Sequence, residues 1–260
     1  MRLIDFFAGI GMFSRAGHEL GMQTVAWVEI EPFLQTYLRR HYPEAKGFSD
    51  IGRTAPQKLP AAEVWTAGFP CQDISVANVK GRTNINGTRS GLYQKTVDLA
   101  GHCRPAYLVF ENTPAIRVAG LDQLLLSLAQ IGYDAEWTTI SAGELGAPIY
   151  RERFFLVASP SGQRLSEGLE VFAGEFAESW RKEMQARAKG WYPLQPPPSG
   201  SDGYEVWRDA IVAAGGLAHD AAPELSAGRF KALGNSVHWL QALYVLGCVQ
   251  NHYHRTKQGV

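Results

Sequence analysis

Short apolar runs of strand length alternate with longer segments whose apolar residues recur at helical spacing. The predicted strands are residues 3–7, 25–28, 64–67, 107–110 and 154–158. The predicted helices between them are residues 32–40, 92–102 and 121–131. This alternation favours a mainly parallel sheet with helices on both faces, which binds its ligands at the carboxyl ends of the strands. We therefore predict an α/β fold with its chemistry at that edge.

The strand rhythm stops after Ser159 and gives way to Gly, Pro and isolated Trp residues. Residues 195–200, Gln-Pro-Pro-Pro-Ser-Gly, fit neither a helix nor a central strand. Residues 175–188 have the pattern of a polar helix, and residues 237–252 regain apolar periodicity and are expected to pack on the sheet. A length of 260 residues thus suggests one sizeable domain with a small additional region.

The charges of the chain balance, with 25 Lys and Arg residues against 25 Asp and Glu residues. A polyanionic partner must therefore be held by a local basic patch. The 3 cysteines show no paired spacing, which argues against a disulfide framework or a zinc site. No apolar run approaches the roughly 18 residues of a membrane helix. We expect a cytoplasmic protein without a bound metal.

A glycine-rich turn follows the first predicted strand, with Gly9 and Gly11 where a helix begins. Such a turn lets a ligand approach the backbone closely. Glu29 ends the next predicted strand, a place where carboxylates accept hydrogen bonds from ribose hydroxyls. Ser14 stands where the dinucleotide fingerprint has its third glycine, so the pattern argues against a dinucleotide. An ordinary tight turn remains the alternative.

Cys71 stands just beyond the strand at residues 64–67, before a segment rich in Gly, Asn, Ser and Thr. A cysteine at a strand's carboxyl end is well placed to be a nucleophile. Its thiol would need positive charge nearby to ionise at neutral pH. A half-buried structural cysteine is the alternative, and it is the interpretation we adopt for Cys103 and Cys248, which lie in helical patterns.

Three charged residues are expected near Cys71. Glu111 follows the strand at residues 107–110, next to the Cys71 strand in the expected order, where it could act on a substrate ring. Arg151 and Arg153 precede the strand at residues 154–158, and a period of two places them on one face. The structural alternatives are a helix N-cap or an ion-pair partner for Glu111 and surface salt bridges for the arginines.

Taken together, these residues resemble the cytosine-5 DNA methyltransferase family. The matching motifs, in order, are Asp5-Phe6-Phe7-Ala8-Gly9-Ile10-Gly11, Glu29, Ser49-Asp50-Ile51, Gly68-Phe69-Pro70-Cys71-Gln72, Glu111-Asn112, Arg151-Glu152-Arg153 and Gly234-Asn235-Ser236-Val237. The resemblance covers residues 1–159 and about 229–252. Single strings of this kind arise by chance, but the ordered series is highly specific.

The resemblance implies a Rossmann-like fold that binds S-adenosylmethionine. Residues 1–159 and 229–260 would form the catalytic domain, and residues 160–228 a small inserted target-recognition region. The implied cofactor pocket consists of Phe7, Gly9, Gly11, Glu29, Ile30, Asp50, Pro70, Leu92, Asn235 and Ser236. In that pocket Phe7 and Ile30 would contact the adenine ring, Glu29 the ribose hydroxyls and Asp50 the adenine amino group.

The family's catalytic residues correspond to Cys71 as nucleophile and to Glu111, Arg151 and Arg153, which grip the target base or its backbone. Carbon 5 of cytosine is a weak nucleophile, and attack by a thiolate at carbon 6 makes it electron-rich. A protonated Glu111 and Arg153 would stabilise the charge that develops on the ring. The sequence does not identify the base that removes the carbon 5 proton.

This chemistry requires a cytosine flipped out of double-stranded DNA, over which residues 72–91 would close. The expected DNA contacts are Gln72, Ser75, Lys80, Arg82 and Arg89. A solvated loop with no DNA contact is the alternative for the basic residues. We expect a monomer, with a cognate restriction endonuclease as a further partner.

The recognition region is short, and Ala222-Pro223-Glu224-Leu225-Ser226-Ala227-Gly228-Arg229 replaces the family's usual pattern before Gly234. Together with the neutral charge, this suggests a short or loosely read target sequence. Three alternatives remain open. One is an RNA cytosine-5 methyltransferase of the same fold, one is a nicotinamide-dependent oxidoreductase, and one is a catalytically idle DNA-binding relative.

Overall fold

The computed structural model describes residues 1–70, 90–147, 150–162, 170–191 and 237–258. Its strands are β1 (Arg2–Phe6), β2 (Gln23–Val28), β3 (Lys46–Phe48), β4 (Val64–Gly68), β5 (Tyr107–Asn112), β6 (Tyr133–Ser141) and β7 (Glu152–Pro160). Its α-helices are α1 (Met12–Glu19), α2 (Pro32–His41), α3 (Tyr93–Cys103), α4 (Ile116–Ala119), α5 (Leu121–Gln130), α6 (Gly174–Trp191) and α9 (Trp239–Gln258). Short 3-10 helices include η1 (Ile51–Arg53) and η4 (Gly143–Leu145).

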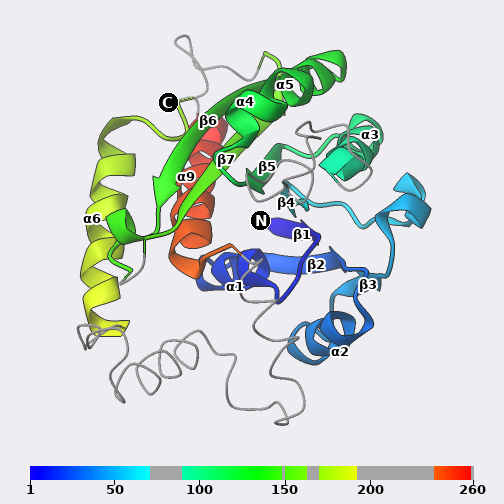
Figure 1. Ribbon diagram of the computed structural model, residues 1–260, viewed down its shortest axis with the longest axis horizontal. Coiled ribbons are helices and arrows are strands. Elements are labelled where there is room, and N and C mark those ends of the chain that lie inside the picture. The colour runs from blue at the N-terminus through cyan, green and yellow to red at the C-terminus, as the bar shows by residue number, and fades with distance from the viewer. Residues whose placement is uncertain (71–89, 148–149, 163–169, 192–236, 259–260) are drawn as a thin grey trace.

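The described strands form one sheet in the order β3-β2-β1-β4-β5-β7-β6 (Figure 1). All neighbours from β3 through β5 are parallel, whereas β7 runs antiparallel to both β5 and β6. The predicted α/β, mainly parallel sheet is therefore confirmed. Because β7 is reversed, its first residues lie at the edge where the parallel strands end.

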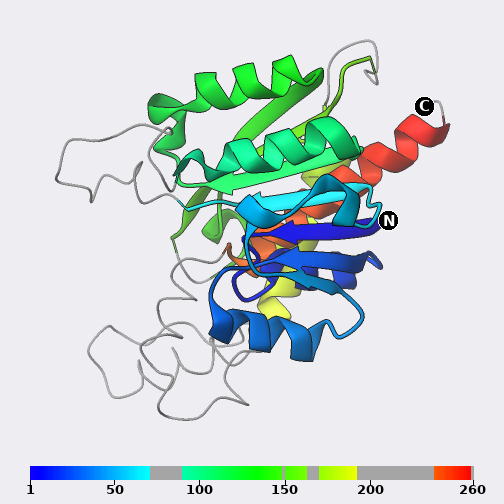
Figure 2. The same cartoon turned by 90° about the vertical axis from the view of Figure 1, so that its right-hand side faces the viewer.

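Helices cover both faces of the sheet (Figure 2). Leu3, Val64 and Val109 pack in a core with residues of α1, α6 and α9. Their strand neighbours Ile4 and Trp65 pack on the opposite face with residues of α3, α4 and α5. Burial on both faces explains why these strands are continuous apolar runs in the sequence.

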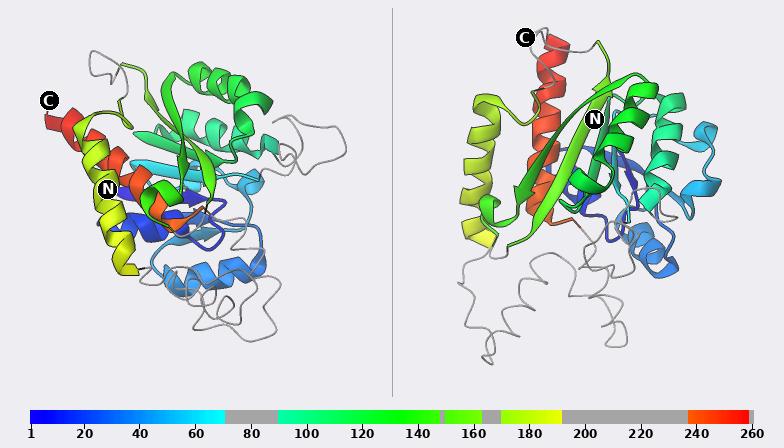
Figure 3. Two further views of the ribbon diagram at one scale, coloured as in Figure 1. Left: turned by 60° about the vertical axis from the view of Figure 1, so that its left-hand side comes forward. Right: turned by 45° about the horizontal axis from the view of Figure 1, so that its top comes forward.

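Helix α6 lies against α9 on one face of the sheet (Figure 3). Its buried residues Ala177, Met184 and Ala188 share a core with Leu243 of α9. This helix falls inside the predicted recognition region of residues 160–228, but it packs as part of the sheet's cover. Residues 192–228 lie outside the described part of the chain.

The predicted strands and helices are present, with ends shifted by a few residues. The structure adds two strands, β3 and β6, for which we had no prediction. Strand β6 carries Asp134 and Glu136 and lies at the edge of the sheet, so it lacks the apolar run of a central strand. Within the described ranges, no helix is long and apolar enough to cross a bilayer.

Candidate active site

The backbone turn after β1 adopts three left-handed conformations in five residues. Phe7 has a φ of 56°, Gly9 of 56° and Gly11 of 72°. Gly11 is the N-cap residue of α1, and the amide of Ala8 donates to the carbonyl of Val28 at 3.1 Å. A Cβ at Gly9 would have only the Phe7 carbonyl oxygen within 4 Å, so the turn leaves space for a ligand next to the backbone.

Asp5 fixes this turn from inside the core. One carboxylate oxygen accepts hydrogen bonds from the amide and hydroxyl of Ser14, at 3.2 and 2.9 Å. The other accepts one from the Thr66 hydroxyl at 2.8 Å. Burial raises the pKa of Asp5 to about 7, although these hydrogen bonds lower it. The carboxyl therefore connects β1, β4 and the start of α1.

Glu29 holds the other side of the turn. Its carboxylate accepts the Gly9 amide on one oxygen and the Glu31 amide on the other, both at 2.8 Å. The side chain amide of Gln35 donates to the Glu29 carbonyl at 2.9 Å. Next to this buried carboxylate, Ile30 is 68% exposed. A fixed acceptor beside an exposed apolar side chain suits a ribose joined to a flat base.

The other expected cofactor residues lie around this edge where the structure describes them. Asp50 caps η1, because its carboxylate accepts the Gly52 amide at 2.7 Å. Pro70 follows β4, and Leu92 precedes α3; both are partly buried. Asn235 and Ser236 lie outside the described residues, and α9 begins shortly after them at Trp239.

The charged centre of the site is an ion pair between neighbouring strands. The guanidinium Nε of Arg153 lies 3.0 Å from a carboxylate oxygen of Glu111. Glu111 is 6% exposed, and its strand pairs Glu111 with Gly68 of β4, three residues before Cys71. A Cβ at Gly68 would lie 3.2 Å from the Glu111 carboxylate. The glutamate and the end of the predicted cysteine strand are therefore adjacent.

Opposing influences act on the ionisation of Glu111. Burial raises its pKa to about 7, while the positive charges of Arg153 and Arg151 lower it. A carboxyl with this pKa can be protonated near neutral pH and then donate a hydrogen bond to a ring nitrogen. The site thus offers a neutral carboxyl and a cation side by side.

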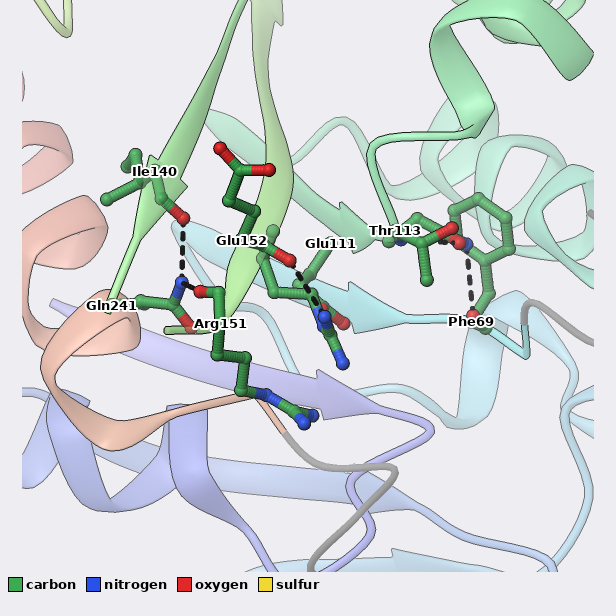
Figure 4. A network of polar contacts seen from close by, with 9 residues as sticks. Phe69, Glu111, Thr113, Ile140, Arg151, Glu152 and Gln241 are labelled. Atoms are coloured by element: carbon green, nitrogen blue, oxygen red, sulfur yellow. Dashed lines mark hydrogen bonds and ion pairs between the residues drawn. The ribbon is translucent and has the colours of Figure 1, made fainter. Parts of the chain in front are cut away.

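Arg151 directly precedes β7 and Arg153 is its second residue, so both lie at the edge where the parallel strands end. The Arg153 Nη1 donates to the Glu152 carbonyl at 2.7 Å, which fixes the guanidinium next to its own strand. Figure 4 shows the side chains of Arg151 and Glu152 leaving the backbone in opposite directions. The positive charges of Arg151 and Arg153 both lower the pKa of the Glu111 carboxyl, so both act on the same group.

Asn112 anchors the segment that leads to Cys71. Its side chain amide donates to the Phe69 carbonyl at 3.2 Å, and its amide oxygen accepts the Thr113 amide at 2.8 Å (Figure 4). The first of these contacts fixes the chain two residues before Cys71, and the second fixes the orientation of the Asn112 side chain. Cys71 and the expected DNA contacts Gln72, Ser75, Lys80, Arg82 and Arg89 lie outside the described residues.

Sequence reasoning did not assign a role to several residues that shape this site. Thr66 interrupts an apolar strand, and Gln241 interrupts the apolar pattern of α9; both are fully buried. A polar residue inside an apolar run is the signal that could have identified them, because buried polar groups require partners. For Asn112 the sequence indicates only a place in the Glu111-Asn112 motif.

Comparison with known proteins agrees with this geometry. The family model for C-5 cytosine-specific DNA methylase matches residues 1–190. The type II methyltransferase M2.BsuMI of Bacillus subtilis (strain 168) is 33% identical over 167 residues, which cover 61% of this chain and 42% of that protein. The type II methyltransferase M.CviJI of Paramecium bursaria Chlorella virus IL3A is 32% identical over 161 residues, covering 60% and 42%.

Solved structures show the same fold at low sequence identity. A DNMT2 variant from Spodoptera frugiperda has a TM-score of 0.65 at 14% identity, and the match covers 95% of this chain and 99% of that one. The Entamoeba histolytica methyltransferase EhMeth has a TM-score of 0.66 at 12% identity, covering 96% and 98%. On the family match, this chain belongs to the C-5 cytosine-specific DNA methylase family.

Proposed function

We propose that this protein transfers a methyl group from S-adenosylmethionine to carbon 5 of a flipped-out cytosine in double-stranded DNA. The observation that carries this proposal is the ion pair between the buried Glu111 and the partly buried Arg153, adjacent to the strand end that leads to Cys71. The family assignment supports the same conclusion. The matched segments span 42% of the two curated relatives named above, so the activity of the whole protein is inferred.

The residues at the carboxyl edge fit S-adenosylmethionine, whose use the family and fold imply in general. Glu29 would accept the ribose hydroxyls on a carboxylate already oriented by two amides. Ile30 and Phe7 would contact the adenine ring, and the open backbone at Gly9 would let the ligand approach. When bound, the sulfonium supplies the methyl group that carbon 5 receives.

The rest of the pocket is assigned from the family pattern. Asp50 would meet the adenine amino group through the carboxylate that now caps η1. The remaining cofactor contacts in this proposal are Gly11, Pro70, Leu92, Asn235 and Ser236.

The protein's own groups would activate the cytosine in a fixed order. The Cys71 thiolate bonds to carbon 6, and the electrons of the ring double bond move to carbon 5. A protonated Glu111 donates to nitrogen 3 while Arg153 stabilises negative charge at the carbonyl edge. After carbon 5 carries the methyl group, loss of its proton restores the double bond and expels Cys71 as thiolate.

Recognition of DNA is assigned to segments next to this edge. In this proposal Gln72, Ser75, Lys80, Arg82 and Arg89 contact the flipped nucleotide or its phosphates. The inserted region of residues 160–228 reads the target sequence, with α6 acting as its fixed base on the catalytic domain of residues 1–159 and 229–260. A cognate restriction endonuclease fits the type II names of the curated relatives.

A paired assay tests the proposed activity. Purified protein is incubated with tritium-labelled cofactor and either duplex DNA or transfer RNA, and label at carbon 5 of cytosine is measured. We expect label in DNA, loss of turnover in Cys71→Ser, and normal turnover in Cys103→Ser, because Cys103 lies at the end of α3. If label appears only in RNA, the substrate of this protein is RNA and not DNA.

A further inference from the structure

The amide of Gln241 joins three elements at the active-site edge. Gln241 lies in the first turn of α9 and is 0% exposed. Its Nε2 donates to the Ile140 carbonyl of β6 and to the Arg151 carbonyl, both at 2.8 Å (Figure 4). One side chain therefore ties the C-terminal helix to two adjacent backbone segments.

One of these carbonyls belongs to the segment that carries the arginines, and the other lies on the strand paired with that segment. Ile140 is paired with Arg153 in the ladder between β6 and β7. Arg151 comes directly before β7, and its carbonyl also accepts the Ala142 amide at 3.0 Å. The Gln241 amide thus fixes the chain at the point where the Arg151 and Arg153 side chains leave it.

The position of this backbone determines whether the guanidinium of Arg153 reaches the carboxylate of Glu111. The Arg153 guanidinium is held by the Glu152 carbonyl at 2.7 Å and reaches Glu111 at 3.0 Å. A shift of the first β7 residues would move both contacts together. Misplacement by about 1 Å is enough to slow a reaction that depends on oriented groups.

Packing alone does not explain a glutamine at this position. Its Oε1 is buried and has no hydrogen-bond partner among the residues that the structure describes. An unpaired buried acceptor costs free energy that an apolar side chain of similar size would avoid. The two donated hydrogen bonds are the feature that a leucine cannot reproduce.

We infer that Gln241 is a positioning residue for methyl transfer, and that its amide holds the β7 backbone so that Arg153 meets Glu111. This inference rests on the proposed function. It concerns a residue outside the family motifs that point to the cofactor and the target base.

Gln241→Leu and Gln241→Met test the inference, with Gln250→Leu as the matched control. Gln250 lies on the same helix, and its Nε2 donates to the Leu20 carbonyl at 2.9 Å, at the end of α1. We expect the Gln241 variants to lose tenfold or more in kcat for DNA methylation, with a change in cofactor Kd below threefold. The Gln250→Leu variant should keep the kcat of the wild type, although its Tm should fall by about as much as that of the Gln241 variants.

A double-mutant cycle separates positioning from general destabilisation. If Gln241 acts through Arg153, the variant Gln241→Leu/Arg153→Gln should be no slower than Arg153→Gln alone. Additive losses in kcat would overturn the inference, as would wild-type kcat in both Gln241 variants or an equal loss in Gln250→Leu. An inactive wild-type protein would instead overturn the proposed function, and with it this role for Gln241.

Discussion

At Glu111, burial and two arginines act in opposite directions on one carboxyl group. Burial disfavours the charged form, and the nearby guanidinium groups favour it, leaving a pKa of about 7. This balance keeps a protonated fraction available at neutral pH, which an exposed glutamate would not have. The proposed donation to nitrogen 3 of cytosine depends on that fraction.

The pH dependence of kcat should show this group. Glu111 is protonated below its pKa, so kcat should fall as the pH rises through about 7. In Glu111→Gln the amide donates at every pH, and the alkaline decline should disappear while kcat drops roughly a hundredfold. Stopped-time assays from pH 5.5 to 9 measure both profiles. A decline unchanged in Glu111→Gln would assign it to another group.

Asp5 is a second buried carboxyl, and it serves structure. Its hydrogen bonds to Ser14 and Thr66 hold the turn that we assign to the cofactor. Burial raises its pKa from 3.8 to about 7. Since the folded state binds the proton more tightly, this group contributes stability that is present at acidic pH and is lost as the pH rises towards 7.

Asp5→Asn should remove this contribution. Wild type and variant are unfolded with urea at pH values between 4.5 and 7.5, and their free energies of unfolding are subtracted. We expect the advantage of the wild type to be largest at the acidic end and to shrink as the pH approaches 7. A difference that stays constant with pH would contradict the raised pKa of Asp5.

At the level of elements, the contact between α6 and α9 is unusually close at one point. A Cβ at Gly247 would overlap the indole of Trp180, so glycine is required for this approach. The two helices cover one face of the sheet that carries the site. Close packing of the two helices would therefore indicate that residues 170–191 fold as part of the catalytic domain.

Gly247→Ala should destabilise the protein by about 1–3 kcal/mol because the added methyl group overpacks this contact. Trp180→Phe removes the indole nitrogen, which is buried without a partner among the described residues, and should reduce the penalty of Gly247→Ala. Urea unfolding of the two single variants and the double variant measures the effect. An equal penalty in both backgrounds would show that the two helices do not touch there.

The strands that the sequence predicted are those buried on both faces. β1, β4 and β5 are predominantly apolar runs, and parallel strands of this kind have a recognisable pattern. β6 escaped prediction because it lies at the edge of the sheet and its half-buried Glu136 accepts the Val171 and Phe172 amides from a segment distant in sequence. No local pattern could indicate that β7 inserts in reverse between β5 and β6.

The candidate site was predictable to the same extent. Glu29 and Glu111 follow predicted strands and the arginines come before one, so the order and direction of the strands bring them to one edge. The hydrogen bonds of Gln241 and Asn112 join segments far apart in the chain, and such contacts leave only a polar residue in an apolar run as a signal. The spacing of the two residues along the sequence does not indicate that Arg153 forms an ion pair with Glu111.

For the whole molecule, the formal net charge of zero limits how DNA is held. Attraction to phosphate must come from local groups, and the small recognition region that we propose would offer few base contacts. We therefore expect a short or loosely defined methylation target. Bisulfite sequencing of DNA from expressing cells measures it. Methylation confined to one site of six or more specified bases would contradict this expectation.

The most direct measurement concerns the bond between Cys71 and the target cytosine. The protein is incubated with S-adenosylmethionine and a duplex containing 5-fluorocytosine, whose fluorine cannot leave as a cation, and the products are digested and analysed by mass spectrometry. We predict a stable adduct of protein and DNA on the peptide that contains Cys71, absent in Cys71→Ser. A methylating protein that forms no adduct, or one on a different residue, would contradict the covalent mechanism.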